Sequence, residues 1–325
     1  MSANRSPAVL RAPLRARALT RALAALVLAL AAGALAGCGL GAGRAPGGVQ
    51  LLVTSGFGAR VLGSWAAPSV RGEETVMSLL QRNARVSTRY SGGFVQSIDG
   101  LSGGHERGAP VDWFYYVNGV EAPLGAAETN VHRGDHIWWD RHDWSQTDHV
   151  PAVVGSFPEP FLNGIAGKRL PVRVQCSSVR GRACSAVLSA LRSAGVPAAV
   201  AALGGGGPQT LNVLVAPWQL ISGFVVAHAI ARGPAASGVY AKFSSGGRAL
   251  TLLDQDGAPR SSLTGAAGLI AATRIGEEAP IWLVTGTGEA GLSLAAQAFN
   301  AQTLDGRFAL AVTSAGTQAL PLVRR

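Results

Sequence analysis

The chain has 325 residues, which is enough for two ordinary domains. Only 14% of the residues are charged and 43 are glycine, while the formal net charge is +10. Because the basic residues beyond the N-terminal segment are scattered and form no clustered face, the composition argues against a nucleic-acid-binding protein.

The first 37 residues have the pattern of an export signal. Five arginines precede an apolar run over 22–36, and that run ends in Leu35-Ala36-Gly37-Cys38. This ending resembles the bacterial lipobox, whose cysteine is diacylated and becomes the mature N-terminus. We therefore expect a signal peptide over 1–37, lipidation of Cys38 and an extracytoplasmic protein that its lipid anchors to the cell membrane. The alternative is an uncleaved membrane anchor, although the run is short for the ~20 residues that a spanning helix needs.

A glycine-rich tether at 38–48 leads into a first domain over 49–150. Asn118-Gly119 lies between two apolar runs and is a strong hairpin signal. The order of elements predicts an α+β, β-grasp-like domain, in which one helix crosses a mixed sheet. The expected elements are strands at 49–54 and 59–67, a helix opened by Glu73-Glu74-Thr75 whose acids face its positive end, a strand at 85–100 with a bulge at Gly92-Gly93, and two aromatic strands within 112–144.

The stretch from Asp112 to Trp144 is the most aromatic part of the chain. Neighbouring side chains of a strand point to opposite faces, so these rings cannot all lie in one core. We expect an exposed aromatic surface, because exposed apolar patches mark binding sites. The predicted ligand-binding residues are Trp113, Tyr115, Tyr116, Asn118, Trp138, Trp139, His142 and Trp144.

The second aromatic strand also carries alternating polar residues. At a period of two, His136, Trp138, Asp140, His142 and Trp144 would share one face. Four histidines within eighteen residues, interleaved with aspartates, could bind zinc or copper. We favour a polar strand edge with pairing on the surface, and predict no metal site.

Three motifs carry a family resemblance. They are YSGGFVQSIDGL at 90–101, DWFYYVNGVEAPLGAAE at 112–128 and RGDHIWWDRHDW at 133–144. In this order they resemble the DUF4430 family, which is similar to the C-terminal β-domain of the vertebrate cobalamin carriers transcobalamin and intrinsic factor. The resemblance covers 49 to about 150. It implies a corrinoid as the ligand, with His142 as a candidate ligand of its cobalt, and a membrane transporter or surface protein as a partner.

A change of pattern marks the second half of the chain. Residues 151–167 contain three prolines and are the expected linker. Beyond it, strands alternate with helices, which predicts an α/β layered domain over 168–325. The expected strands are 170–175, 210–216, 281–285 and 308–313, with a hairpin of 238–244 and 249–254; the expected helices are 183–194, 218–231, 266–273 and 289–299.

Two further patterns occur in this half. Cys176 and Cys184 are an even pair in an exported chain, so a disulfide is expected, with two reduced thiols as the alternative. Residues 286–291 read GTGEAG, which has the spacing of a dinucleotide-binding loop. Glu289 would place a carboxylate where a pyrophosphate should bind, so we favour a tight strand–helix turn capped by Glu289. His228, within an apolar helix, is expected in the core.

The leading hypothesis is a non-enzymatic lipoprotein that captures a ligand with its aromatic hairpin, has no resident cofactor and passes the ligand to a transporter. No nucleophile or metalloprotease motif points to catalysis. The alternative is an interaction or scaffolding module, in which the aromatic surface docks a partner protein or the α/β domain. Docking of the two domains would bury Trp138 and Trp139 between them, whereas ligand binding would leave both lining an open cleft.

Overall fold

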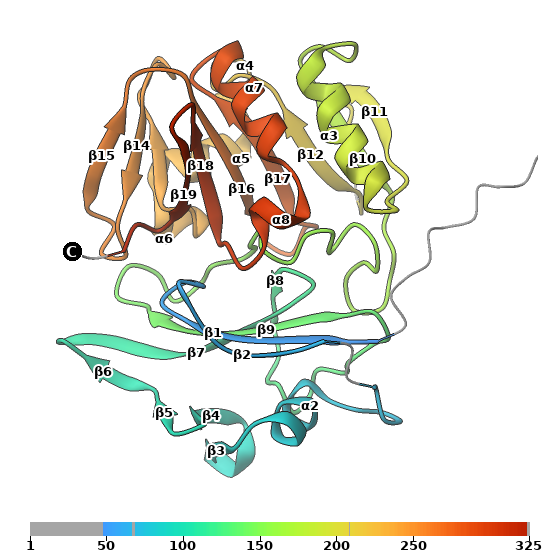
Figure 1. Ribbon diagram of the computed structural model, residues 1–325, viewed down its shortest axis with the longest axis vertical. Helices are drawn as coiled ribbons and strands as arrows, with labels where there is room; N and C mark the ends of the chain where they lie inside the picture. Colours follow the sequence, from blue (N-terminus) through green and yellow to red (C-terminus); the bar gives the residue numbers. More distant parts are fainter. Residues whose placement is uncertain (1–47, 67–68, 208, 324–325) are drawn as a thin grey trace, which may run out of the picture. The chain divides into compact units, whose positions relative to one another are not determined.

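The computed structural model describes residues 48–66, 69–207 and 209–323, all of which belong to one compact unit (Figure 1). The predicted signal peptide and Cys38 lie outside these residues. Among the described helices, none is both long and apolar enough to cross a membrane. The fold is α+β, with mixed and antiparallel sheets and few helices.

The first half, up to residue 150, is built on a six-stranded mixed sheet in the order β2-β1-β9-β7-β6, with β8 paired to β7. Strand β1 runs parallel to β9, and the other pairs are antiparallel. A separate small sheet contains β3, β4 and β5. The elements are β1 (Gln50–Ser55), β2 (Arg60–Trp65), α2 (Val76–Asn83), β3 (Val86–Arg89), β4 (Phe94–Ile98), β5 (Leu101–Ser102), β6 (Gly104–Glu106), β7 (Ala109–Val117), β8 (Val120–Glu121) and β9 (His136–Asp143).

Two turns in this half test the sequence-based expectation, one confirming it and the other contradicting it. Asn118 and Gly119 have φ of 54° and 74°, which gives the tight β7–β8 hairpin that their sequence predicts. The single strand expected over 85–100 is wrong, because a short 3₁₀ turn at Tyr90–Gly92 folds it into the β3–β4 hairpin. Tyr90 takes a φ of 52°, and the glycines after it serve the turn rather than a bulge.

One face of the six-stranded sheet is covered by α2 and the small sheet. Val76, Leu79 and Leu80 recur at helical spacing and are fully buried. They pack in one core with Trp113 and Trp139 from the sheet. This helix therefore holds the aromatic strands from one side only, and leaves their other side to the second half of the chain.

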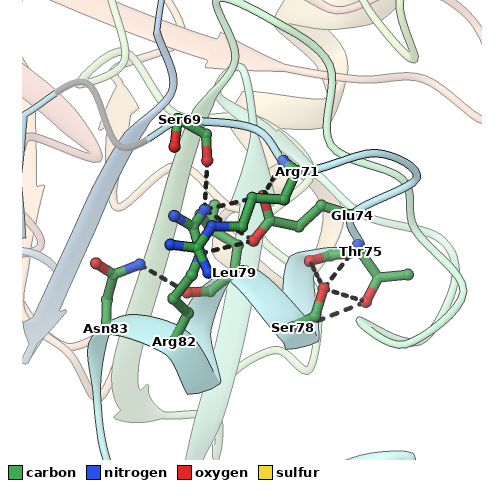
Figure 2. Close-up of polar contacts among 8 residues, drawn as sticks. All are labelled: Ser69, Arg71, Glu74, Thr75, Ser78, Leu79, Arg82 and Asn83. Carbon is green, nitrogen blue, oxygen red and sulfur yellow. Dashed lines mark hydrogen bonds and ion pairs between the residues drawn. The ribbon is translucent and has the colours of Figure 1, made fainter.

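The start of α2 is fixed by a buried ion pair. Thr75 is the N-cap, and its side chain accepts a hydrogen bond from the Ser78 amide. Glu74 lies directly before the cap, near the positive end of the helix as expected but outside its first turn. Its carboxylate instead accepts hydrogen bonds from Arg82 Nε at 2.9 Å and from the Arg71 amide at 2.9 Å (Figure 2). The pair joins the two ends of the helix through the preceding loop.

We predict that Arg82→Ala lowers the free energy of unfolding by about 2–3 kcal/mol, because it leaves the Glu74 carboxylate buried without its cation. The two side chains are 20% and 5% exposed, so the effect is smaller than for a fully enclosed pair. Urea unfolding would measure it. The control is Arg85→Ala, whose pair with Asp99 is exposed and should contribute less than about 0.5 kcal/mol. Equal losses in the two variants would contradict the prediction.

The second half is layered around a seven-stranded sheet in the order β11-β10-β12-β17-β16-β18-β19. The strands from β11 to β17 are parallel, and those from β17 to β19 are antiparallel. Helices α3 and α7 pack on one face, in front of the sheet in Figure 1, whereas α4, α5 and the three-stranded sheet β13-β14-β15 pack on the other. The elements are β10 (Val172–Cys176), α3 (Arg182–Ser193), β11 (Ala199–Ala202), β12 (Leu211–Val215), α4 (Trp218–Ile221), α5 (Val225–Arg232), α6 (Pro234–Ser237), β13 (Ala241–Phe243), β14 (Leu250–Leu253), β15 (Pro259–Leu263), β16 (Ala267–Thr273), β17 (Ile281–Gly286), α7 (Glu289–Ala298), α8 (Ala301–Leu304), β18 (Ala309–Thr313) and β19 (Gly316–Leu320).

Two helix predictions in this half need correction. The segment expected as a helix at 266–273 is β16, a strand with all seven residues buried. The helix expected over 218–231 is broken by a turn at Ser222–Phe224 into α4 and α5. His228 on α5 is exposed rather than part of the core. Strands β11, β15 and β19, which the sequence pattern missed, are short and largely exposed edge or hairpin strands.

Two glycines of the GTGEAG motif allow close packing of α7 on the sheet. A Cβ at Gly286 would lie 2.3 Å from the Gly291 carbonyl carbon, and one at Gly291 would lie 2.3 Å from the Ala267 oxygen. The N-cap of α7 is Gly288, with a φ of 108° and no side-chain cap, so the expected cap by Glu289 is wrong. Next to this turn, Cys176 at the end of β10 and Cys184 in α3 are joined by a disulfide.

Candidate binding site

The predicted aromatic residues lie on both faces of the β7–β9 pair. On the α2 side, Tyr115 and Trp139 stack with ring centroids 4.8 Å apart. The Tyr115 hydroxyl donates a hydrogen bond to the Leu124 carbonyl at 2.6 Å, and Trp113 Nε1 donates to Leu101 O at 3.1 Å. Both tryptophans are buried in the core of the first half. These rings hold their own domain together, and Tyr115 also fixes the chain after β8.

On the opposite face, the rings of β7 and β9 pack against the second half. Tyr116, Trp138 and His142 surround Phe308, which precedes β18, with centroids 5.5, 5.1 and 5.5 Å from its ring. Phe57, from the β1–β2 turn, completes the cluster at 5.2 Å. Trp138 is fully buried between the halves, and Trp139 is buried in the core of the first half, so neither lines an open cleft.

The two remaining predicted residues have different surroundings. Trp144 is 37% exposed, and its indole nitrogen donates to Asp112 Oδ2 at 3.0 Å. Asn118 is fully buried, donates to Asp135 Oδ1 and to Gly164 O, each at 2.8 Å, and accepts a hydrogen bond from the His136 amide. Trp144 is therefore the most exposed member of the predicted set, and Tyr115 is half-buried, so the expected exposed aromatic surface is wrong.

The segment at 151–167, expected as a linker, is buried and connects the two halves. The Val153 amide donates to Gly119 O in the first half at 2.9 Å, and the Val154 amide donates to Phe308 O in the second half at 3.2 Å. Ser156 bonds to His136 Nδ1 at 2.8 Å within the same interior. Backbone groups that reach both halves make this segment a structural layer rather than a flexible connector.

A second buried polar contact lies at the far end of this segment. The Asn163 side-chain amide donates one hydrogen bond to Gly134 O at 3.0 Å and a second, short one to Glu159 Oε1. Burial raises the pKa of Glu159 to about 7, with the Asn163 hydrogen bonds acting in the opposite direction. Buried carboxyl groups with raised pKa values often mark functional sites, but here the partners are turns of the connecting segment. The arrangement positions the segment and exposes no reactive group.

His142 and Asp140 are the most perturbed titratable pair on β9. The His142 ring is stacked between Phe57 and Phe114, with centroids 4.4 Å from each. Burial lowers the pKa of His142 to about 3 and raises the pKa of Asp140 to about 7. His142 Nδ1 has no hydrogen-bond partner and lies 4.0 Å from Asp140 Oδ2. Within the described ranges, no group of three or more metal-ligating side chains is assembled.

A groove beside β8 lies where the two halves meet. It consists of two adjoining hollows of about 390 and 410 Å³, which have Glu121, Ala122, Pro123 and Arg274 in common. We call it the β8 groove. Its first part is mainly apolar, and its second part is bordered by α6 and the turn after β16. The apolar lining is Val117, Val120, Pro123, Leu124, Ile165 and Ala166.

Two charged residues of the β8 groove, Glu121 and Arg274, line both hollows, and His149 lines the second. Burial raises the pKa of Glu121, while His149, whose Nδ1 lies 3.5 Å from its carboxylate, lowers it. Arg274 donates to the carbonyls of Glu277 and Glu278 and is thereby held in its own turn. The groove thus offers an apolar wall next to a few fixed charges, which is the usual character of a small-molecule site.

The β8 groove does not follow from the sequence, because its residues form no aromatic or charged motif. The signal that could have found it is the run Val120–Leu124 directly after the Asn118-Gly119 turn, where a proline and an exposed leucine follow a two-residue strand. The motif at 112–128 contains this run, but its rings drew attention to the wrong residues.

Comparison with known proteins gives one family model. No curated protein matches the chain. A family model, described as a domain of unknown function (DUF4430), matches residues 73–143. The matched range runs from the loop before α2 to the end of β9, and it contains every predicted ligand-binding residue except Trp144. Residues 73–143 of this chain are a DUF4430 domain.

Proposed function

We propose that the chain is a non-catalytic binding protein that holds a small ligand in the β8 groove. In this proposal it is an exported lipoprotein held at the membrane through Cys38, and residues 49–150 form a β-grasp-like domain with α2 across a mixed sheet. The single observation that carries the proposal is the β8 groove itself: two joined hollows at the contact of the halves, apolar on one side and charged on the other.

A corrinoid is the ligand class to test first. The DUF4430 domain is the source of this expectation, and an amphipathic ring with polar side groups suits an apolar wall that is bordered by Glu121, Arg274 and His149. The two hollows are in the size range of small-molecule sites, so a corrinoid would be held partly enclosed. The buried rings of β7 and β9 take no part in this contact. Their role is to fix the Val120–Leu124 run against the second half.

Equilibrium dialysis of cobalamin and cobinamide against the fragment Gly43–Arg325 tests the proposal, because this fragment contains every described element. We expect saturable binding that Leu124→Glu weakens about tenfold or more, since the variant removes apolar contact and adds a charge to the groove. The matched control is Leu220→Glu on α4, because the two leucines are 55% and 56% exposed. Equal loss in both variants, or no saturable binding, would overturn corrinoid binding at the groove.

A second candidate function, an interaction module without a small ligand, is favoured by a different observation. The aromatic face formed by Tyr116, Trp138 and His142 already binds a protein surface, namely the second half of the same chain. A photo-crosslinking residue placed at position 124, compared with one at position 220, would test this function in intact cells. A protein captured only from position 124 would support it, and equal capture from both positions would count against it.

A further inference from the structure

A second cavity lies at the opposite end of β9 from the Asn118-Gly119 turn. Its volume is about 270 Å³. Its lining comes from the β1–β2 hairpin, the β6–β7 turn, the end of β9 and two positions of the second half, Gln255 and Val323. We call it the arginine cavity. It shares no lining residue with the β8 groove.

Three arginines from three different elements line the arginine cavity. Arg141 is 11% exposed, donates through Nε to Ser102 O and pairs with Glu106 at 2.7 Å. Arg60 begins β2, and Arg107 lies at the tip of the β6–β7 hairpin with a φ of 52°. Within the described ranges, neither Arg60 nor Arg107 forms an ion pair.

The acids of the same cavity do not balance these cations. Glu106 is paired with Arg141, and Asp143 Oδ1 accepts hydrogen bonds from the amide and hydroxyl of Ser145. Three arginines against two carboxylates leave a formal excess of one positive charge. Guanidinium groups without carboxylate partners are the donors that proteins use for phosphate and carboxylate ligands.

A buried imidazole forms the inner wall of the arginine cavity. His142 lines the arginine cavity although it is only 3% exposed. Its Nδ1 lacks a hydrogen-bond partner, and its ring is held rigidly between two phenylalanines. Because that Nδ1 atom is inaccessible and lies 4.0 Å from Asp140 Oδ2, the imidazole contributes a wall to the cavity rather than a hydrogen-bond donor.

We propose that the arginine cavity binds a small oxyanion, a phosphate or carboxylate group, through Arg60, Arg107 and Arg141, with His142 as its uncharged inner wall. The volume accommodates such a group together with a short organic portion. Because Gln255 and Val323 belong to the second half, a bound anion contacts both halves of the molecule. This site is independent of the β8 groove and of the ligand proposed for it.

Isothermal titration calorimetry of the fragment Gly43–Arg325 with inorganic phosphate and with succinate, at constant ionic strength, tests the site. We expect saturable binding with a dissociation constant of about 1 mM or tighter for at least one of the two anions. Arg60→Gln and Arg107→Gln should each weaken it about tenfold, which is the usual effect of losing one charged hydrogen-bond donor. The anion that binds more tightly identifies the recognised group.

Two matched variants separate this site from general attraction of anions to a basic protein. Arg85→Gln removes an exposed arginine on the far small sheet and should leave the affinity unchanged. Glu106→Gln releases Arg141 from its carboxylate and should raise the affinity severalfold. A loss of affinity in Arg85→Gln equal to that in Arg60→Gln, a weaker Glu106→Gln, or no saturable binding at millimolar anion would each overturn the proposal. Leu124→Glu, in the β8 groove, should leave anion binding unchanged. The test of this site and the test of the β8 groove can therefore be overturned separately.

Discussion

Phe308→Ala should lower the free energy of unfolding by about 3–5 kcal/mol, which is the range for removing a fully packed aromatic ring. Phe308 is 3% exposed, and its ring contacts Phe57, Tyr116, Trp138 and His142. These four residues belong to the first half, whereas Phe308 belongs to the second. The cavity left by the substitution would therefore open at the contact between the halves, where neither core can easily relax to fill it.

Urea unfolding followed by tryptophan fluorescence would measure this effect, because Trp138 is one of the contacting rings. The matched control is Phe94→Ala, since Phe94 is partly exposed and its ring contact is with the exposed Tyr90. We expect the control to lose about 1 kcal/mol or less. If Phe308→Ala and Phe94→Ala were equally destabilising, the aromatic cluster would not be the main contact between the halves.

Asp140→Asn should remove a pH-dependent contribution of up to about 4 kcal/mol to the free energy of unfolding. Burial raises the pKa of Asp140 to about 7 from 3.8, and each pKa unit corresponds to about 1.4 kcal/mol. The fold favours the protonated carboxyl, so its contribution is fully present below about pH 4 and is lost as the pH rises through 7. The variant carries no such group and retains an oxygen that can accept the hydrogen bond of the Gly58 amide.

The measurement is the difference in unfolding free energy between variant and wild type from pH 4 to 8. We expect the difference to shift in favour of Asp140→Asn as the pH rises. Burial lowers the pKa of His136 to about 4 and that of His142 to about 3, so both destabilise the fold as the pH falls below 6.5. The effect of His136 cancels in the difference between the two proteins, whereas His142 lies 4.0 Å from Asp140 and couples to the substitution. A difference that is constant across this range would contradict a raised pKa of the buried Asp140 carboxyl. Asp99→Asn, at an exposed position, serves as the control.

Local sequence patterns predicted the elements whose signals are short in range. The β7–β8 hairpin follows from Asn118-Gly119, and α2 follows from the spacing of Val76, Leu79 and Leu80. The alternation along β9 was also correct, since Trp138 and Trp139 lie on opposite faces of the sheet. In each case the physical cause, a turn conformation or a side-chain period, acts within a few residues.

The predictions that failed depend on what lies above and below an element. The segment at 267–273 is rich in alanine and apolar throughout, a pattern that a buried helix and a central strand share. The strand β16 forms because packed layers cover both faces of the sheet around it, and the segment itself gives no sign of those layers. The segment expected as a linker at 151–167 does connect the two halves, but its prolines do not reveal that Val153 and Val154 bond to two different parts of the chain. Sequence spacing contains no information about those partners.

The candidate site shows the same limit. Sequence analysis found the aromatic residues correctly as a group but not their role, because a ring that binds a ligand and a ring that binds a neighbouring sheet have the same composition. Trp138 and Tyr116 face Phe308, which lies 170 and 192 residues further along the chain. The β8 groove and the arginine cavity are formed by ordinary residues that become a site only when the two halves meet.

Because β1 lies between β2 and β9 inside its sheet, the chain cannot be cut at the limits of the family match without breaking that sheet. The family match begins at residue 73, after β1 and β2, yet all six residues of β1 pair with β9. A fragment cut at 73–143 would turn β9 into a bare edge with eight residues of unpaired backbone on one side, an arrangement prone to aggregation. The portable unit of this fold therefore includes Gln50–Trp65 and the buried segment at 151–167, neither of which the family match covers.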